Sequence, residues 1–139
     1  MDAFSFLQTL RNSNFISNNP IRNINNTQLK ALIVRDVTII DVRIPYEWED
    51  TGIIQSSIPI LFIDEKGRTQ ERHWMKQVSK YTHPKKGVAL ICKSGRRSRI
   101  AAEYLAISQG YKKIYNLVGG IQNWIAEGNE TIQWTKNVA

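Results

Sequence analysis

Residues 88–110 read VALICKSGRRSRIAAEYLAISQG, so a short apolar run, a basic polar loop and a helical pattern follow one another directly. The run 88–92 has the length and composition of a strand that is buried on both faces. The apolar face of the helical pattern consists of Ile100, Ala101, Tyr104, Leu105 and Ile107. Gly110 suits the end of that helix. The stretch therefore predicts a strand, a loop and a helix, with Cys92 at the carboxyl end of the strand.

The rest of the chain repeats this alternation. Strand-like runs occur at 21–24, 36–42, 53–63 and 113–117, and helical patterns follow at about 26–34, 45–51, 69–81 and 119–128. Such alternation predicts an α/β fold with a mainly parallel central sheet flanked by helices on both faces. A length of 139 residues suits one domain.

Two polar clusters stand where ligands of such folds bind, beyond the carboxyl ends of the strands. One contains Asp41 and Arg43, and the other begins at Cys92. In the second cluster Gly95 permits a tight turn, and the start of the helix near Ser98 adds free amides and partial positive charge. Lys93, Arg96 and Arg97 add full charges. These features favour a nucleophilic thiolate over a merely apolar core cysteine.

The composition of the chain argues against several kinds of site and location. The net charge is +7, and residues 51–139 hold fourteen Lys/Arg against six Asp/Glu. The single cysteine excludes an intrachain disulfide, and two distant histidines argue against a Cys/His metal site. The start has no signal-peptide pattern, and no run approaches the roughly 18 apolar residues of a membrane span. We expect a soluble cytoplasmic protein, in which a reduced thiol persists.

The spacing within the loop bears on its ligand. Cysteine phosphatases and related arsenate reductases place an arginine six positions after the cysteine, where this chain has Ser98, and Arg97 comes one residue earlier. A smaller ring of amides fits a smaller anion, such as a terminal sulfur on the cysteine, better than a tetrahedral phosphate.

Three segments in order resemble the single-domain rhodanese-like sulfurtransferase family. They are DVRIPYEWEDTG at 41–52, ICKSGRRSRIAAEYL at 91–105 and YKKIYNLVGGIQNWIAEG at 111–128, and the match covers about residues 22–128. The resemblance implies that Cys92 accepts a sulfane sulfur and becomes a persulfide. It implies that the loop holds this persulfide through Lys93, Ser94, Gly95, Arg96, Arg97 and Ser98. Asp41 and Arg43 match supporting residues near that site.

The resemblance also suggests a division of the chain. We expect an N-terminal arm or short helix over 1–20, a rhodanese-like domain over 21–130 and a C-terminal tail over 131–139. Two departures affect the shape of the pocket: Ile53 stands where the family usually has histidine, and Ser56-Ser57 replace a frequent Gly-Ala.

The leading hypothesis is an enzyme. The Cys92 thiolate attacks the outer sulfur of a small anionic donor such as thiosulfate, sulfite leaves, and an external thiol or protein acceptor takes the sulfur. No metal or organic cofactor is expected. The alternative is a non-enzymatic or carrier rhodanese-like module that binds a protein partner.

Two further interpretations are weaker. The basic half suggests RNA, but the aromatic residues are not interleaved with lysines, and Trp48, Trp74 and Trp124 lie in helical patterns that predict core positions. We therefore expect neither nucleic-acid nor membrane partners. Asp41 and Glu47 could form an acid/base pair, but ion pairing of both with Arg43 is the favoured interpretation.

Overall fold

The computed structural model describes residues 1–13 and 19–136. The helices are α1 (Ala3–Ser13), α2 (Asn26–Val34), α3 (Pro45–Thr51), α4 (Glu71–Val78), α5 (Arg96–Ser108) and α6 (Gly120–Ala126). The strands are β1 (Ile21–Ile24), β2 (Thr38–Asp41), β3 (Ser57–Pro59), β4 (Val88–Ile91) and β5 (Ile114–Leu117). None of the described helices is long and apolar enough to cross a membrane.

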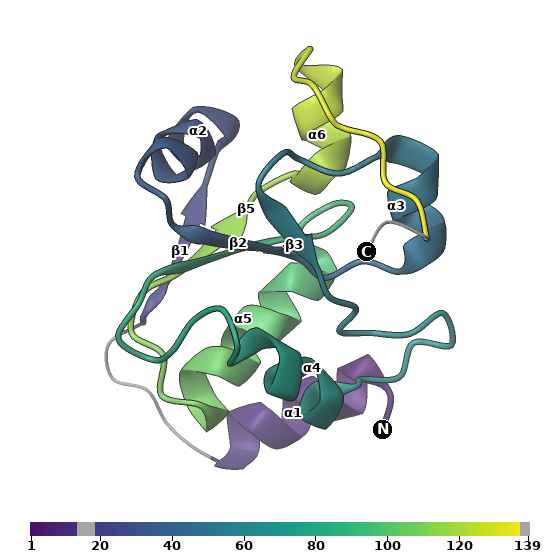
Figure 1. The fold of residues 1–139 in the computed structure, drawn as a ribbon. Helices are drawn as coiled ribbons and strands as arrows, with labels where there is room; N and C mark the ends of the chain where they lie inside the picture. Colours follow the sequence, from purple (N-terminus) through teal and green to yellow (C-terminus); the bar gives the residue numbers. More distant parts are fainter. Residues whose placement is uncertain (14–18, 137–139) are drawn as a thin grey trace.

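These strands form one sheet in the order β1-β5-β4-β2-β3, and every neighbouring pair is parallel (Figure 1). The central strand β4 is buried along its whole length, as its continuous apolar sequence predicts. Helices cover both faces of the sheet. The predicted α/β class with a parallel sheet is therefore confirmed.

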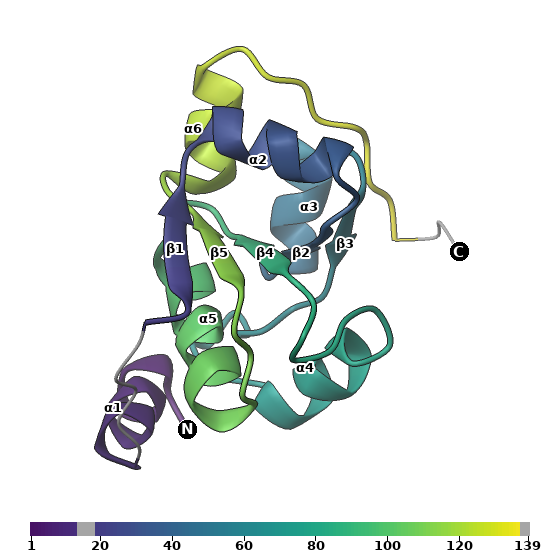
Figure 2. The same ribbon diagram turned by 90° about the vertical axis from the view of Figure 1, so that its left-hand side faces the viewer.

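Alternate residues of β4 point to opposite layers. Val88, Leu90 and Cys92 join the cluster formed with α1, α4 and α5, whereas Ala89 and Ile91 join the cluster formed with α2 and α6. Helix α3 lies on the same side as α2 and α6 (Figures 1 and 2). The cysteine side chain is thereby directed toward α5.

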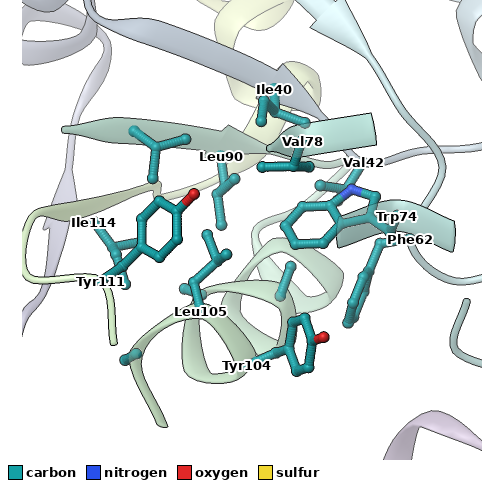
Figure 3. Packing of buried hydrophobic residues seen from close by; sticks show 14 of the residues in the cluster. Ile40, Val42, Phe62, Trp74, Val78, Leu90, Tyr104, Leu105, Tyr111 and Ile114 are labelled. Atoms are coloured by element: carbon teal, nitrogen blue, oxygen red, sulfur yellow. The ribbon is translucent and has the colours of Figure 1, made fainter. Parts of the chain in front are cut away.

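An aromatic group dominates the α4/α5 layer (Figure 3). The rings of Phe62 and Trp74 meet edge to face with centroids 4.9 Å apart, and Tyr104 packs against both. The indole N–H of Trp74 donates to the Ile60 carbonyl at 3.0 Å, so this buried ring leaves no unpaired donor. All three tryptophans predicted to lie in the core are buried.

Both ends of the described chain pack on the domain. Helix α1 inserts Phe6 and Leu10 into the α5 layer, so 3–13 of the predicted N-terminal arm form a helix, while 14–18 lie outside the described residues. At the other end, Ile132 pairs with Ile53 and the Trp134 ring lies 5.1 Å from the Trp48 ring. The part of the predicted tail that the structure describes is thus in contact with the domain.

Two helix ends differ from their predicted positions. Helix α5 begins at Arg96, ahead of the expected start near Ser98. Helix α4 ends at Val78, before the predicted end at about residue 81, and Tyr81 beyond it is exposed. Asn25 caps α2, because its side chain accepts from the Gln28 amide at 2.8 Å while the Gln28 side chain accepts from the Asn25 amide.

Candidate active site at the Cys92 loop

Cys92 lies one residue beyond the carboxyl end of β4, where the loop to α5 begins. The residue is entirely buried, yet its sulfur meets polar groups. Cys92 Sγ accepts a hydrogen bond from the Gly95 amide at 3.0 Å and lies 3.3 Å from Ser98 Oγ. One fixed backbone donor therefore contacts the sulfur, and hydrogen bonds from backbone N–H groups to anionic acceptors are among the stronger ones in proteins.

Gly95 allows this arrangement because it takes a backbone conformation that other residues avoid. Its φ is +102°, and it occupies the N-cap position of α5. A Cβ added there would lie 3.3 Å from the Leu117 carbonyl oxygen, so the residue also packs tightly against the end of β5. The glycine thus turns its N–H toward the sulfur and lets the loop approach the sheet.

Asn116 is a site residue that the sequence interpretation missed. It is buried in β5, beside Leu90 of β4, and accepts a hydrogen bond from Ser98 Oγ at 2.5 Å. Its amide group donates to the Gly95 carbonyl at 3.2 Å. Because Ser98 has one hydroxyl proton, it donates either to Asn116 or to the sulfur, and Asn116 holds the shorter contact. The signal in the sequence that could have indicated this role is the polar residue within the apolar run KIYNL at 113–117.

The double glycine at the start of α6 supports the loop from the other side. The Ile121 amide donates to the Cys92 carbonyl at 2.9 Å, and the Gln122 amide donates to the Lys93 carbonyl at 3.1 Å. Gly120 has a φ of +59°, and a Cβ added to it would lie 2.5 Å from the Cys92 carbonyl oxygen. Only glycine therefore permits this close approach of α6 to the cysteine.

Asp41 and Arg43 form a buried ion pair at the end of β2. Arg43 Nη2 lies 2.8 Å from Asp41 Oδ2, and the side chains are 1% and 0% exposed. The same guanidinium reaches the Thr51 hydroxyl and the Gly52 carbonyl, while the Trp48 indole donates to Asp41. The pair fixes α3 against the sheet next to the loop.

Glu47 does not pair with Arg43 as expected; its carboxylate binds Arg97. The two Oε–Nη distances are 2.6 and 2.7 Å, whereas Arg43 reaches only the Glu47 backbone carbonyl. Burial raises the pKa of Glu47, whereas the hydrogen bonds and the charge of Arg97 lower it. The lowering outweighs the effect of burial, so the pKa lies below its ordinary value. The pKa of Arg97 is raised, chiefly by the hydrogen bond with Glu47.

The remaining loop residues face solvent. Lys93, Ser94 and Arg96 are exposed, so two positive charges that Glu47 does not neutralise stand at the surface of the loop. Asp41 and Glu47 bind different arginines, which leaves no carboxylate pair for acid/base work. In the described part of the chain, no group of three His, Cys, Asp or Glu side chains could hold a metal ion.

The arrangement defines a class of protein: a parallel α/β domain that presents one cysteine at the carboxyl end of a strand, in a compact loop whose Gly95 amide donates to the sulfur. Residues 25–127 match the family model of the Rhodanese-like domain. The chain belongs to the rhodanese-like family, as its three motifs indicated.

Individual proteins show the same relationship. Thiosulfate sulfurtransferase 18 of Arabidopsis thaliana is 31% identical over 104 residues, which are 71% of this chain and 74% of that protein. A solved rhodanese-related protein from Thermoplasma volcanium is 31% identical, with a TM-score of 0.62 over 81% of this chain and 99% of that one. The polysulfide-sulfur transferase homodimer of Wolinella succinogenes, 22% identical, shares the fold with a TM-score of 0.63 over 98% and 93%.

Proposed function

We propose that this protein is a sulfurtransferase that moves a sulfane sulfur from a small anionic donor to a nucleophilic acceptor through a persulfide on Cys92. The observation that carries the proposal is the hydrogen bond from the Gly95 amide to Cys92 Sγ, 3.0 Å long, at the end of a buried parallel strand. Fixed donors of this kind stabilise an anionic sulfur without reorganising during the reaction.

The first half-reaction charges the cysteine. The Cys92 thiolate attacks the outer sulfur of a thiosulfate-like donor, a new sulfur–sulfur bond forms at Sγ, and sulfite leaves with the electron pair of the broken bond. Lys93 and Arg96 are exposed on the loop and attract the anionic donor. Arg97 contributes less to this attraction than its sequence position suggested, because Glu47 offsets its charge.

The second half-reaction discharges the persulfide. An acceptor thiolate attacks the outer sulfur, and Cys92 Sγ leaves as the thiolate, ready for another donor. The sequence has one cysteine, so the acceptor comes from outside the chain. The Gly95 amide donates to Cys92 Sγ, which is negatively charged before the first step and again after the second.

Intact-protein mass spectrometry tests the proposal. After incubation with thiosulfate we expect a mass gain of about 32 Da, one sulfur, on the nucleophilic thiolate. The gain disappears on treatment with cyanide and does not occur in the Cys92→Ser variant. No gain in the folded wild-type protein would contradict the sulfurtransferase. A gain that cyanide and small thiols fail to remove would instead favour a carrier that serves one dedicated protein.

A further inference from the structure

An open groove of about 860 Å³ lies beside the Cys92 loop, between α1 and α5. Figure 2 shows α1 running alongside α5 at one edge of the domain. One wall consists of α1 residues, including Phe4 and Leu7, and the other of α5 residues, including Ile100. Ser94 and Gly95 line the groove and also belong to the loop that surrounds the sulfur.

Helix α1 carries more apolar surface than its packing uses. Phe6 and Leu10 are four residues apart and enter the core. Phe4 and Leu7 form a second pair on the groove side, and Phe4 is 71% exposed. Val118, after β5, adds another exposed apolar side chain to the lining. The groove therefore offers apolar lining that no described segment covers.

The charged lining of the groove is positive. It contains Arg11, Arg96 and Arg99 against Glu103, so three positive charges and one negative charge leave a formal charge of +2. Glu103 is bound by Arg11 through two hydrogen bonds of 3.0 Å and lies 3.6 Å from Arg99. The excess charge attracts an acidic ligand.

The dimensions suit a short extended peptide. Groove residues on α5 run from Arg96 to Glu103, seven positions that rise about 10 Å along the helix. An extended segment of about three residues spans that length. One end of such a segment would lie at Ser94 and Gly95, next to the sulfur.

We propose that this groove binds an acidic segment of an acceptor protein, with apolar side chains against Phe4 and Leu7 and a cysteine at the loop end. The inference rests on the proposed sulfurtransferase function. The acceptor thiolate attacks the outer persulfide sulfur, the acceptor acquires the persulfide, and Cys92 Sγ leaves as the thiolate. Helix α1 lies outside the matched family region 25–127, whereas the wall formed by α5 and the loop lies inside it.

The test uses a blocked peptide with the sequence Glu-Leu-Asp-Cys-Leu-Glu, and a counterpart with lysine at the acidic positions. The double variant Phe4→Ser/Arg99→Glu is compared with Val34→Ser and Arg72→Glu, which alter an exposed apolar residue on α2 and an exposed arginine on α4. We expect kcat/KM for sulfur transfer to the acidic peptide to fall about tenfold in the double variant, with transfer to cyanide within about twofold. The two control variants should transfer to both acceptors at wild-type rates.

Any one of three results would contradict the proposal that the groove binds the acidic segment. The first is an unchanged kcat/KM for the peptide in the double variant, and the second is an equal loss of kcat/KM toward peptide and cyanide. The third is equal transfer to the acidic and the lysine peptide by the wild type. Urea midpoints confirm that each variant is folded, and Phe4→Ser alone replaces the double variant if that one is unstable.

A binding measurement separates this proposal from the sulfurtransferase function. Fluorescence anisotropy with a serine-for-cysteine acidic peptide needs no persulfide. If thiosulfate adds no sulfur to Cys92, the proposed function is wrong, but the anisotropy still shows whether the groove binds the acidic peptide. Equal binding of that peptide to the wild type and the double variant would end the groove proposal, whereas weaker binding to the double variant alone would support it.

Discussion

Replacing Arg43 by leucine should cost this fold a large part of its stability. The side chain is 1% exposed and makes six hydrogen bonds, to Asp41, Glu47, Thr51 and Gly52. Without it, Asp41 stays fully buried and keeps only the Trp48 indole and the backbone amide of residue 43 as donors. Removing one partner of a buried ion pair costs about 3–5 kcal/mol.

Urea denaturation, followed by tryptophan fluorescence and by far-UV circular dichroism, measures this loss. With a slope of about 2 kcal/mol per molar urea, the midpoint should fall by about 1.5–2.5 M. Arg68→Leu is the matched control, because Arg68 is 56% exposed and lies 3.5 Å from Asp64. An exposed pair of that kind contributes less than about 1 kcal/mol.

A second substitution distinguishes loss of charge pairing from loss of packing. In Asp41→Asn/Arg43→Leu the buried negative charge is gone, so the double variant should be more stable than Arg43→Leu alone. The reasoning is refuted if Arg43→Leu unfolds at the same urea concentration as Arg68→Leu. It is also refuted if the double variant is no more stable than the single one, because the loss would then come from the missing volume alone.

Three further predictions concern the loop and its supports. The fold lowers the pKa of Glu47. The ionised carboxylate therefore stabilises the fold at pH values above its unfolded pKa of about 4.3, and this stabilisation is lost as the pH falls through the folded pKa. Glu47→Gln should lower the free energy of unfolding by about 1 kcal/mol near pH 7 and by less near pH 3. A pH-independent difference in urea midpoints would contradict the pairing with Arg97. Asn116→Leu should slow the mass gain with thiosulfate about tenfold, because the loop carbonyl and the serine hydroxyl lose their partner; an unchanged rate would rule out this positioning role. Gly120→Ala should destabilise more than Gly110→Ala by at least about 1 kcal/mol, since both have positive φ but only Gly120 faces a carbonyl oxygen; equal urea midpoints would count against close packing there.

The local pattern of the sequence was enough for the fold and for the position of the thiol. These predictions use features of neighbouring residues: the strand and helix periods, glycine breaks and a β-branched composition. Such local features can be recognised without knowledge of any long-range contact. That is why β4, the following loop and α5 are predictable from residues 88–110, and why Cys92 was expected at the end of a strand. Element boundaries were less certain, as the start of α5 at Arg96 shows.

Contacts between distant residues were decided by the tertiary structure alone. Glu47 and Arg97 stand fifty positions apart, and only the packing of α3 beside the loop makes Arg97 the partner of that carboxylate instead of Arg43. Asn116 reaches Ser98 because the β4–β5 register places it beside Leu90. Both contacts depend on long-range geometry, which the identity of a residue and its neighbours does not encode.

The same distinction applies to the groove. The sequence by itself left an arm or a short helix open for residues 1–20, but it determined that the half of the chain with the cysteine is basic, because charge is a sum over composition. Only the docking of Phe6 and Leu10 against α5 decided that Phe4 and Leu7 stand opposite an arginine-lined helix, next to the sulfur. Which surface of a helix remains uncovered depends on where the remainder of the chain has packed, and that is settled by the whole fold.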